Sequence, residues 1–372
     1  MSESAQNDLR TDAGQTVTIG RHPIGPGHPP FIIAEMSGNH NGDISRALDL
    51  IEAAKAAGAD AVKLQTYTAD TITIDHDGPG FVIEEGLWRG RRLYELYQEA
   101  HTPWDWHRDL FERASKLDIA IFSTPFDPTA VAFLEALGAA AYKIASFELV
   151  DLPLIDLVAR TGKPLIMSTG LASPDEIADA VSAVRSAGGL APILLHCTSG
   201  YPTPAREMNL RTMRHLSETH GVITGLSDHS TGVAVSVAAV ALGASVIEKH
   251  FTLNRADGGP DAAFSLEPGE LRQLVDDCRG AWESLGSVDY GLVESEVAAK
   301  DLRRSLYVVS DIRRGERLTL ANIRSIRPGF GLPPRYLPAI LGKLAVQDLA
   351  RGTPLSWSMF ENTAVRDRGP SQ

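Results

Sequence analysis

The strongest constraint on the fold is a regular alternation of short apolar runs with helical segments between residues 31 and 285. Such runs, each ending in polar residues, are typical of parallel strands joined by crossover helices. Eight of them predict a (β/α)8 TIM barrel. An open doubly wound sheet would show the same alternation, but no GxGxxG motif follows the first run, which disfavours it. The expected strands are residues 31–35, 61–65, 119–124, 141–146, 164–169, 192–198, 222–229 and 245–252.

The clearest single unit of this pattern is residues 222–252, which contain a strand, an apolar helix and a second strand. Both strands of a parallel βαβ unit end at the same edge of the sheet, so we expect His229 and His250 to lie together there. Two imidazoles at one edge suit a divalent metal. The alternative is that each histidine makes only a hydrogen bond at its strand end; Asp228 and Glu248 beside them favour a site.

The remaining segments predict a second, smaller domain. Residues 1–30 form an expected polar tail and a hairpin that plugs the N-terminal end of the barrel, which spans residues 31–286. A polar, acidic linker follows, and then a segment rich in strand and turn signals that is long enough to fold by itself. The expected bounds are 287–302 for the linker, 303–362 for the second domain and 363–372 for a disordered tail.

One connection inside the barrel is unusually long. Residues 67–102 carry Trp88, Tyr94 and Tyr97 and are expected to form a loop. Connections of this length inside an α/β domain are usually lids or oligomer contacts.

Composition excludes several classes of protein. The net charge of −12, without a basic stripe, argues against binding to nucleic acid. No apolar run reaches the length of a membrane span and the polar start lacks the core of a signal peptide, which favours a cytoplasmic protein without membrane contact. The two cysteines cannot form a disulfide framework, and Cys197, inside an apolar strand, is expected to be a buried thiol.

The polar residues at the strand ends point to a composite active site, because in such a barrel they face one mouth. Lys63 and Lys143, with nearby hydroxyls, suit a phosphate. Glu35 and Glu248 suit sugar hydroxyls or proton transfer, and the histidines suit a metal that polarises a carbonyl. The lysines could instead pair with the glutamates, or Lys143 could form a Schiff base. The full set is Glu35, Lys63, Gln65, Thr124, Lys143, Ser146, Ser168, Thr198, Ser227, Asp228, His229, Glu248 and His250.

Six motifs along the chain resemble the sialic acid synthases, and residues 303–360 resemble the antifreeze-like (SAF) domain of that family. The resemblance covers about residues 16–360. It implies that phosphoenolpyruvate condenses with an N-acetylated amino sugar. The motifs are IAEMSGNHNG (33–42), VKLQT (62–66), STPFD (123–127), YKIAS (142–146), GLSDH (225–229) and EKHFT (248–252).

The resemblance also implies a role for each residue. It implies that Arg327 of the second domain reaches the N-acetyl group of the sugar from the partner subunit of a domain-swapped homodimer. It implies that His229 and His250 bind manganese, with magnesium or cobalt as alternatives. The implied catalytic residues are Glu35, Lys63, Lys143 and Asp228, and the implied substrate-binding residues are Gln65, Thr124, Ser146, Ser168, Tyr201, Ser227, Glu248 and Arg327.

Within the family, residues 67–73, 87–106 and 305–309 resemble the pseudaminic acid synthases. Ser199 stands where the neuraminate enzymes commonly have Asn, which removes one amide partner for the sugar. The implied sugar is 2,4-diacetamido-2,4,6-trideoxy-L-altrose and the implied product is pseudaminic acid. The nearest alternative is a neuraminate or legionaminate synthase with the same chemistry, and a more distant one is a non-catalytic sugar-phosphate-binding barrel.

Overall fold

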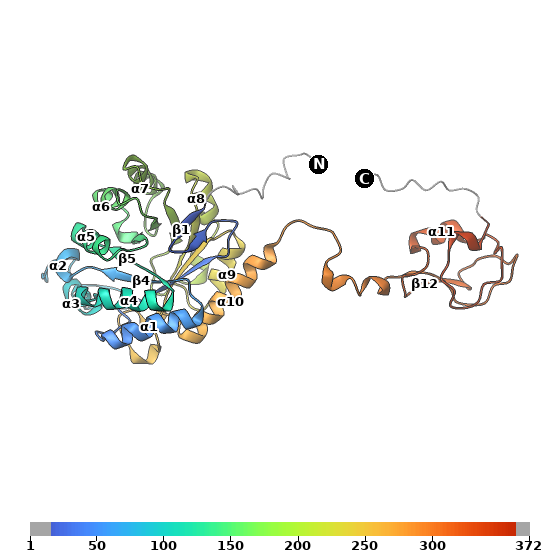
Figure 1. Ribbon diagram of the computed structural model, residues 1–372, viewed down its shortest axis with the longest axis horizontal. Helices are drawn as coiled ribbons and strands as arrows, with labels where there is room; N and C mark the ends of the chain where they lie inside the picture. The colour runs from blue at the N-terminus through green and yellow to red at the C-terminus, as the bar shows by residue number, and fades with distance from the viewer. Residues whose placement is uncertain (1–15, 362–372) are drawn as a thin grey trace. The chain divides into compact units, whose positions relative to one another are not determined.

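The computed structural model describes residues 16–361, and the chain divides into two compact units, residues 1–286 and 287–372 (Figure 1). The tails expected at residues 1–15 and 363–372 lie outside the described residues. Within the described range, no helix combines the length and the apolar character needed to cross a bilayer. The bounds expected for the linker and the second domain stay predictions.

The first unit contains a closed barrel of eight parallel strands, in the order β10-β3-β4-β5-β6-β7-β8-β9. This confirms the predicted fold class. Because all the strands run in one direction, all their carboxyl ends open at one mouth. The strands are β3 Phe31–Glu35, β4 Ala61–Thr66, β5 Ala120–Pro125, β6 Tyr142–Ile144, β7 Leu165–Ser168, β8 Ile193–Cys197, β9 Thr224–Asp228 and β10 Val246–His250.

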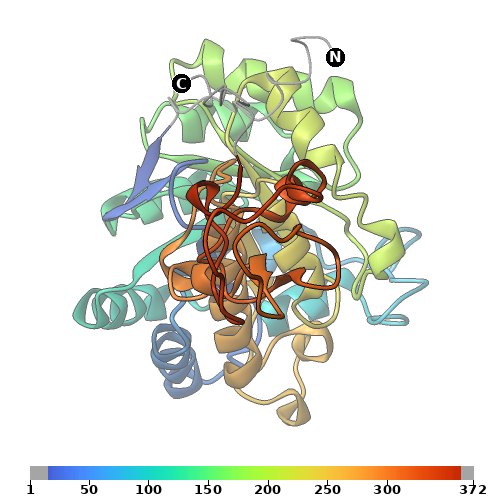
Figure 2. The ribbon, with the colours of Figure 1, turned by 90° about the vertical axis from the view of Figure 1, so that its right-hand side faces the viewer.

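The helices of this unit surround the barrel (Figure 2). Two helix starts that the sequence signals clearly have the expected caps: Asp43 accepts a hydrogen bond from the Ser45 N–H, and Ser173 with Glu176 forms a capping box. The helices are α1 Ile44–Ala57, α2 Ala69–Ile72, α3 Leu93–Ala100, α4 His107–Leu117, α5 Pro128–Ala136, α6 Leu152–Ala159, α7 Pro174–Ser186, α8 Thr212–His220, α9 Ala234–Ala241 and α10 Pro268–Leu285.

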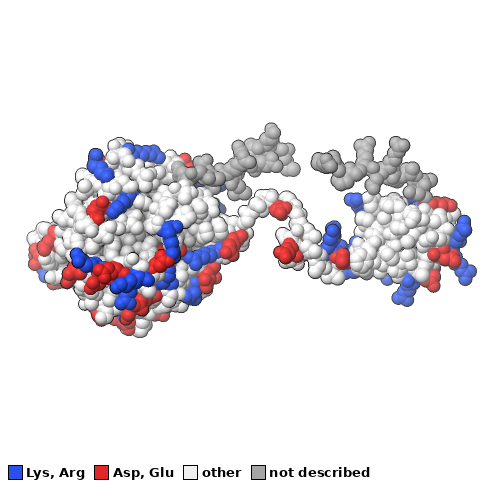
Figure 3. All heavy atoms as spheres, in the orientation of Figure 1, with Lys and Arg blue, Asp and Glu red and all other residues white. Residues whose placement is uncertain are grey.

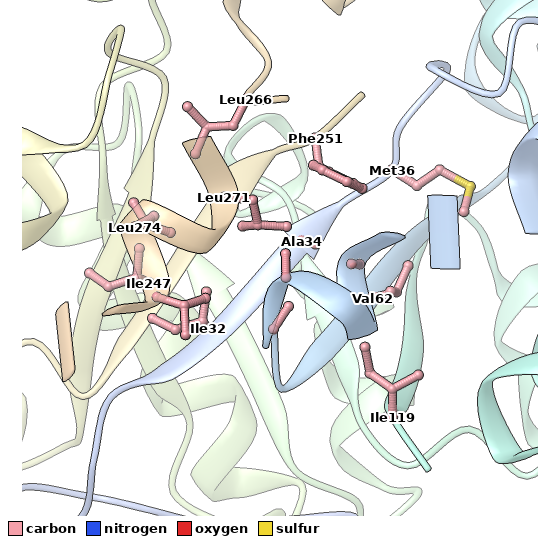
Figure 4. Packing of buried hydrophobic residues seen from close by; sticks show 14 of the residues in the cluster. Ile32, Ala34, Met36, Val62, Ile119, Ile247, Phe251, Leu266, Leu271 and Leu274 are labelled. Atoms are coloured by element: carbon pink, nitrogen blue, oxygen red, sulfur yellow. The ribbon is translucent and has the colours of Figure 1, made fainter. Parts of the chain in front are cut away.

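Alternate residues of each strand face the helices and form the outer core. Figure 4 shows Ile32 and Ile247, from neighbouring strands, close to Leu271 and Leu274 of α10, and all four are buried. Side chains of a strand alternate between its two faces, so the residues between these positions face the interior of the barrel. The direction of each polar side chain near the mouth follows from this alternation.

The N-terminal end of the barrel is closed by the hairpin expected from the sequence. Strands β1 (Val17–Ile19) and β2 (His22–Ile24) pair in antiparallel fashion. Ile19 and Ile24 are completely buried and pack with Phe31, Ile33 and Phe122 of the barrel interior. The hairpin therefore plugs this end with apolar side chains and leaves the opposite end for the polar residues.

The connection between β4 and β5 is more ordered than the loop expected from the sequence. It contains α2 and α3, and between them a turn held by an antiparallel bridge from Val82 to Arg92 and by a hydrogen bond from the Gly90 N–H to the Ile83 carbonyl, 2.7 Å. The turn places Trp88 near its tip.

The second unit is built mainly from turns and single β-bridges. Its one two-stranded sheet among the described residues joins β11 (Ser305–Val308) to β12 (Ile323–Ile326), and α11 (Leu337–Ile340) is short. Leu306, Ile312 and Leu318 are among the residues of its own buried core. On the face drawn in Figure 3, acidic and basic side chains are interspersed over each unit.

Candidate active site

The strand register brings most of the predicted site residues to the interior of the mouth. Glu35 of β3 lies opposite Lys63 of β4 on one side and His250 of β10 on the other. Glu248 of β10 lies opposite Ser227 of β9. Since residues paired in register share a face, these side chains converge on the same space. Gln65 and Thr124 form a further such pair.

A cluster of charges occupies the centre of the mouth. Lys63 Nζ lies 2.8 Å from Glu35 Oε2 and 3.6 Å from Glu248 Oε2. Lys143 Nζ lies 3.6 Å from Glu248 Oε1 and donates a hydrogen bond of 2.7 Å to Ser168 Oγ. The four charged residues are at most 5% exposed. The pairing of lysines with glutamates that the sequence left open is therefore present.

Burial and the neighbouring charges shift the pKa values of all four side chains in this cluster. Burial opposes ionisation of Glu248, but Lys143 and Lys63 outweigh it and hold the pKa of Glu248 below its usual range. Burial would lower the pKa of Lys63, but Glu248 and Glu35 raise it. Burial raises the pKa of Glu35 and lowers that of Lys143. An incoming phosphate dianion would compete with Glu248 for both lysines.

Hydroxyl and amide groups surround the charges. Gln65 donates a hydrogen bond of 3.0 Å to Glu35, and Ser227 donates one of 3.1 Å to Glu248. Lys63 Nζ donates to Thr124 Oγ1 at 3.3 Å. Gln65 also donates a hydrogen bond of 3.1 Å to Ser37 Oγ. These hydroxyl and amide groups can form hydrogen bonds with a substrate as well as with the charged side chains.

Ser146 lies where two strand-end loops approach closely. Its Oγ accepts a hydrogen bond of 3.1 Å from the Gly170 N–H. A Cβ added at Gly170 would lie 2.7 Å from Ser146 Oγ and closer still to Ser199 Oγ. A larger residue at position 170 would have to displace both hydroxyls, so the glycine allows this close approach of a backbone N–H and two serine side chains.

His229 and His250 meet at the mouth, as the βαβ unit predicts. Their ring centroids are 5.3 Å apart. His229 Nδ1–H donates a hydrogen bond of 3.1 Å to the Thr198 carbonyl, so Nε2 is the ring nitrogen that a cation could use. Burial, reinforced by His229, holds the pKa of His250 well below its usual range, so His250 is neutral.

The hydrogen bonding of the two histidines fits a metal site. His250 Nδ1 is buried and has no hydrogen-bond partner within residues 16–361. A metal-ligating histidine commonly donates its other ring N–H to a carbonyl, as His229 does. In the same range, no group of three or more His, Cys, Asp or Glu side chains is placed to hold a metal ion. A cation here would take two protein nitrogens and complete its coordination with water or substrate oxygens.

Cys197 lies directly beside this pair. Its Sγ is 3.8 Å from His229 Nδ1, and it is a buried, free thiol, as the sequence predicts. Burial would raise the pKa of Cys197, but contact with His229 lowers it to about 7. The same contact raises the pKa of His229 against the effect of burial.

An aromatic wall covers the histidines, and its member Phe264 was not predicted from the sequence. The Tyr201 ring lies 4.4 Å from the His229 ring and 5.3 Å from Phe264. The Trp88 ring lies 5.5 Å from Tyr201, and its indole N–H donates a hydrogen bond of 2.8 Å to the Pro260 carbonyl. The long connection after β4 therefore forms part of the site.

Two acidic residues near the mouth were missed. Asp261 is buried and accepts a short hydrogen bond from Ser37, and its Oδ2 lies 3.8 Å from His250 Nδ1. Glu148 follows β6; burial raises its pKa to about 7, and its Oε2 is buried without a hydrogen-bond partner in the described range. The sequence offered one signal: both residues follow barrel strands, and neither lies in the strand itself.

Two predicted residues are not brought to the mouth by this chain's barrel. Asp228 faces away from the interior, because Ser227 and His229 on either side of it face inward, and it pairs with Lys249. The catalytic role implied for Asp228 would therefore not come from direct contact with a substrate at the mouth. Arg327 follows β12 in the second unit, where its side chain is exposed.

Together, these features define a TIM-barrel protein of the class that carries an active site at one mouth, here a lysine–glutamate cluster beside a histidine pair. The sequence matches the NeuB family over residues 50–290 and the SAF domain over residues 303–361. The chain belongs to the NeuB family, which confirms the resemblance to the sialic acid synthases and the SAF identity of the second domain.

Individual relatives agree with this assignment. The chain is 44% identical over 336 residues to the pseudaminic acid synthase of Helicobacter pylori, covering 90% of this chain and 99% of the relative. It is 35% identical to the N,N'-diacetyllegionaminic acid synthase of Legionella pneumophila, covering 92% and 98%. The crystal structure of the N-acetylneuraminic acid synthetase of Leptospira borgpetersenii, in complex with citrate, is similar with a TM-score of 0.68 and 35% identity, covering 77% of this chain and 95% of that one.

Proposed function

We propose that this chain condenses phosphoenolpyruvate with 2,4-diacetamido-2,4,6-trideoxy-L-altrose and water to give pseudaminic acid and phosphate. The observation that carries the proposal is the meeting of Lys63 and Lys143 with His229 and His250 at one barrel mouth. Lysines suit the phosphate of one substrate, and histidines suit a metal that activates the carbonyl of the other. The identity to the pseudaminic acid synthase, 44% against 35% for the legionaminic acid synthase, supports the choice of sugar.

The charged cluster binds phosphoenolpyruvate in this proposal. Lys63 and Lys143 leave Glu248 and bind the phosphate and carboxylate oxygens, while Ser168 and Ser227 donate hydrogen bonds. Thr124 and Ser146 complete the contacts from the neighbouring strands. The exchange is favourable because a dianion offers the lysines more charge than one glutamate does.

The sugar lies toward the histidines and the aromatic wall. Gln65, Tyr201 and Glu248 contact its hydroxyl and acetamido groups, and Glu35 lies beside the reacting carbons. His229 and His250 would hold a divalent cation, which we propose to be manganese, with magnesium or cobalt as alternatives. When bound, such an ion polarises the aldehyde oxygen of the open-chain sugar.

The reaction then forms a C–C bond between the two substrates and breaks the C–O bond to the phosphate. C3 of phosphoenolpyruvate adds to the aldehyde carbon, and C2 becomes oxocarbenium-like. Water adds at C2, and the tetrahedral intermediate expels phosphate by cleavage of the C–O bond. Lys63 and Lys143 stabilise the negative charge on the departing phosphate throughout.

The proposal includes a domain-swapped homodimer in which Arg327 of each subunit reaches the sugar's N-acetyl group in the partner's site. A mixture of the inactive variants His229→Ala and Arg327→Ala tests it after subunit exchange, at low sugar concentration. Swapped heterodimers contain one complete site, so roughly a quarter of wild-type activity returns. No recovery would show that Arg327 acts within its own chain, and an Arg327→Ala variant that is fully active by itself would show that Arg327 has no role. We also propose a cytoplasmic location, which the two free cysteines support.

Phosphate release from phosphoenolpyruvate tests the function directly. The assay contains manganese and one of three sugars: the diacetamido-trideoxy-altrose, its mannose-configured counterpart, or N-acetylmannosamine. A chelated sample is the control. Turnover only with the altrose sugar is expected. Preference for another sugar would make the chain a legionaminate or neuraminate synthase, and no release with any sugar would favour a non-catalytic sugar-phosphate binder.

A further inference from the structure

A buried ion pair lies directly behind the two histidines. Lys249 of β10 is paired in register with Asp228 of β9, and its Nζ lies 2.8 Å from Asp228 Oδ2. Each side chain is at most 1% exposed. Both point away from the mouth, because the residues on either side of them point into it. The pair therefore contacts neither the substrates nor a cation at the mouth.

The pair belongs to a closed set of hydrogen bonds. Asp228 also accepts from the Ser230 N–H at 2.8 Å and from Ser236 Oγ of α9 at 2.6 Å. Lys249 donates a second hydrogen bond, of 2.6 Å, to the Ser230 carbonyl. Lys249, which immediately precedes His250, is thus tied to the residues on both sides of His229. These contacts connect the backbones that carry the two histidines.

The neighbouring positions show that charge is not required there for packing. Leu226 and Ile247, the preceding outward-facing residues on the same strands, are apolar and completely buried. A buried ion pair seldom adds net stability compared with an apolar pair, because both charges lose their hydration. Its particular contribution is directional: four polar contacts permit one arrangement of the strand ends.

We propose that Asp228 and Lys249 position His229 and His250, and thereby set the affinity of the mouth for a divalent cation. The inference rests on the proposed function for the presence of that cation. Asp228 is a positioning residue in this view, and not a ligand of the sugar. It acts through the backbone of residues 228–230, and Lys249 acts through the backbone that leads into His250.

The test is the double variant Asp228→Asn/Lys249→Met. Removing both charges avoids leaving one buried charge without its partner. The affinity for MnCl2 alone is measured by isothermal titration calorimetry and by the electron paramagnetic resonance signal of free Mn2+, without substrates. We expect a dissociation constant about 10 to 100 times that of the wild type, as for other supporting contacts of metal ligands. The melting temperature is measured in the same samples.

A matched control removes an ion pair at the other end of the barrel. Asp60 immediately precedes β4, and Arg279 of α10 donates to it at 3.0 Å. The variant Asp60→Asn/Arg279→Met is expected to bind Mn2+ as the wild type does, whatever its melting temperature. A loss of affinity in both double variants would show that Mn2+ binding follows general stability, and would overturn the positioning role.

The remaining outcomes separate this inference from the proposed function. A folded Asp228→Asn/Lys249→Met variant with wild-type affinity would overturn the inference alone. A wild-type protein that turns over its substrates without binding Mn2+ would overturn it together with the choice of metal. If the double variant does not fold, Ser236→Ala removes one donor to Asp228 without a change in charge. We expect its Mn2+ dissociation constant to rise severalfold, and an unchanged value would overturn the inference.

Discussion

The two ends of the barrel are built from the same strands but from opposite kinds of side chain. At the N-terminal end, Ile19 and Ile24 of the hairpin pack on the apolar residues Phe31 and Ile33, and none of the four is more than 2% exposed. At the C-terminal end, two residues beyond Ile33 on the same strand, Glu35 is equally buried but faces Lys63. Burial at the first end stabilises the fold, whereas burial at the second has a cost.

The cost at the mouth is visible in its polar groups. Glu148 has an oxygen that is buried without a hydrogen-bond partner among residues 16–361, and Glu35 and Glu248 are buried charges paired with buried lysines. Such groups are costly unless a ligand satisfies them. Stability and chemistry are therefore separated along the barrel axis. Changes at the mouth should therefore alter activity without loss of stability, and changes at the plug should do the reverse.

The largest expected effect is the loss of turnover on removal of a histidine. His229→Ala or His250→Ala should lower metal-dependent phosphate release by about a thousandfold or more, because one of two protein nitrogens for the cation is lost. The melting temperature should not fall. Phosphate release with manganese and a thermal melt measure both quantities.

The control for this prediction is a histidine at the opposite end. His22 lies 3.7 Å from Asp60, near the plug. His22→Ala should leave the turnover number close to that of the wild type. Full activity in either mouth variant would contradict the assignment of the metal site.

The plug should show the opposite behaviour. Ile24→Ala removes a completely buried side chain and should lower the free energy of unfolding by about 2 to 5 kcal/mol. The KM values for both substrates should stay unchanged in the folded protein. Denaturant unfolding and steady-state kinetics check this, with exposed Thr18→Ala on the neighbouring strand as the control. A raised KM in Ile24→Ala would mean that the two ends are coupled.

Much of this architecture could be predicted because it follows from local patterns. The alternation of apolar runs and helices predicts the barrel, and the βαβ rule brings His229 and His250 together without any knowledge of the remaining strands. Asp43 and Ser173 mark the starts of their helices by side-chain chemistry. Helix α8, in contrast, has no side-chain cap and buries only Met213 and Leu216, so it gives a weak signal.

The features that could not be predicted depend on contacts between distant parts of the chain. Trp88 meets the Pro260 carbonyl across 172 positions, and no local pattern links them. Asp261 likewise meets Ser37 only in the closed barrel. The outward direction of the Asp228 side chain, in contrast, could have been predicted from the alternation of side chains along a strand. If Ser227 and His229 face inward, Asp228 must face outward. A list of strand-end polar residues overlooks this alternation.

The buried acid Glu148 should show the stability cost of the mouth as a function of pH. Burial raises its pKa in the folded protein to about 7, while the unfolded chain loses the proton near the usual value for glutamate. Between these values the folded state binds more protons, so stability falls as pH rises and the full cost is present above about pH 7.

The variant Glu148→Gln should therefore melt at a higher temperature than the wild type above about pH 7, by the equivalent of about 1 to 2 kcal/mol, and at a similar temperature near pH 4. Thermal melts across this range measure the difference. Exposed Glu84→Gln is the control and should show no such trend. A constant difference at all pH values would contradict the titration of Glu148 and point to packing alone.

The smallest expected effect concerns the aromatic wall at the mouth. A tryptophan lies near each end of the barrel, so the same substitution can be compared at both ends. Trp88→Ala removes the ring that packs on Tyr201 and the hydrogen bond to the Pro260 carbonyl. Loss of about 1 kcal/mol of aromatic contact should raise the KM for the sugar roughly fivefold, with a smaller change in kcat. Steady-state kinetics at saturating phosphoenolpyruvate measure this.

Trp282 of α10, which lines a cavity of about 270 Å³ with His22 and Phe31 near the plug, is the matched control. Trp282→Ala should lower stability and leave the KM for the sugar unchanged. Equal KM values in the two tryptophan variants would mean that the wall does not contact the sugar, and would confine the chemistry of the mouth to its charged cluster and histidines.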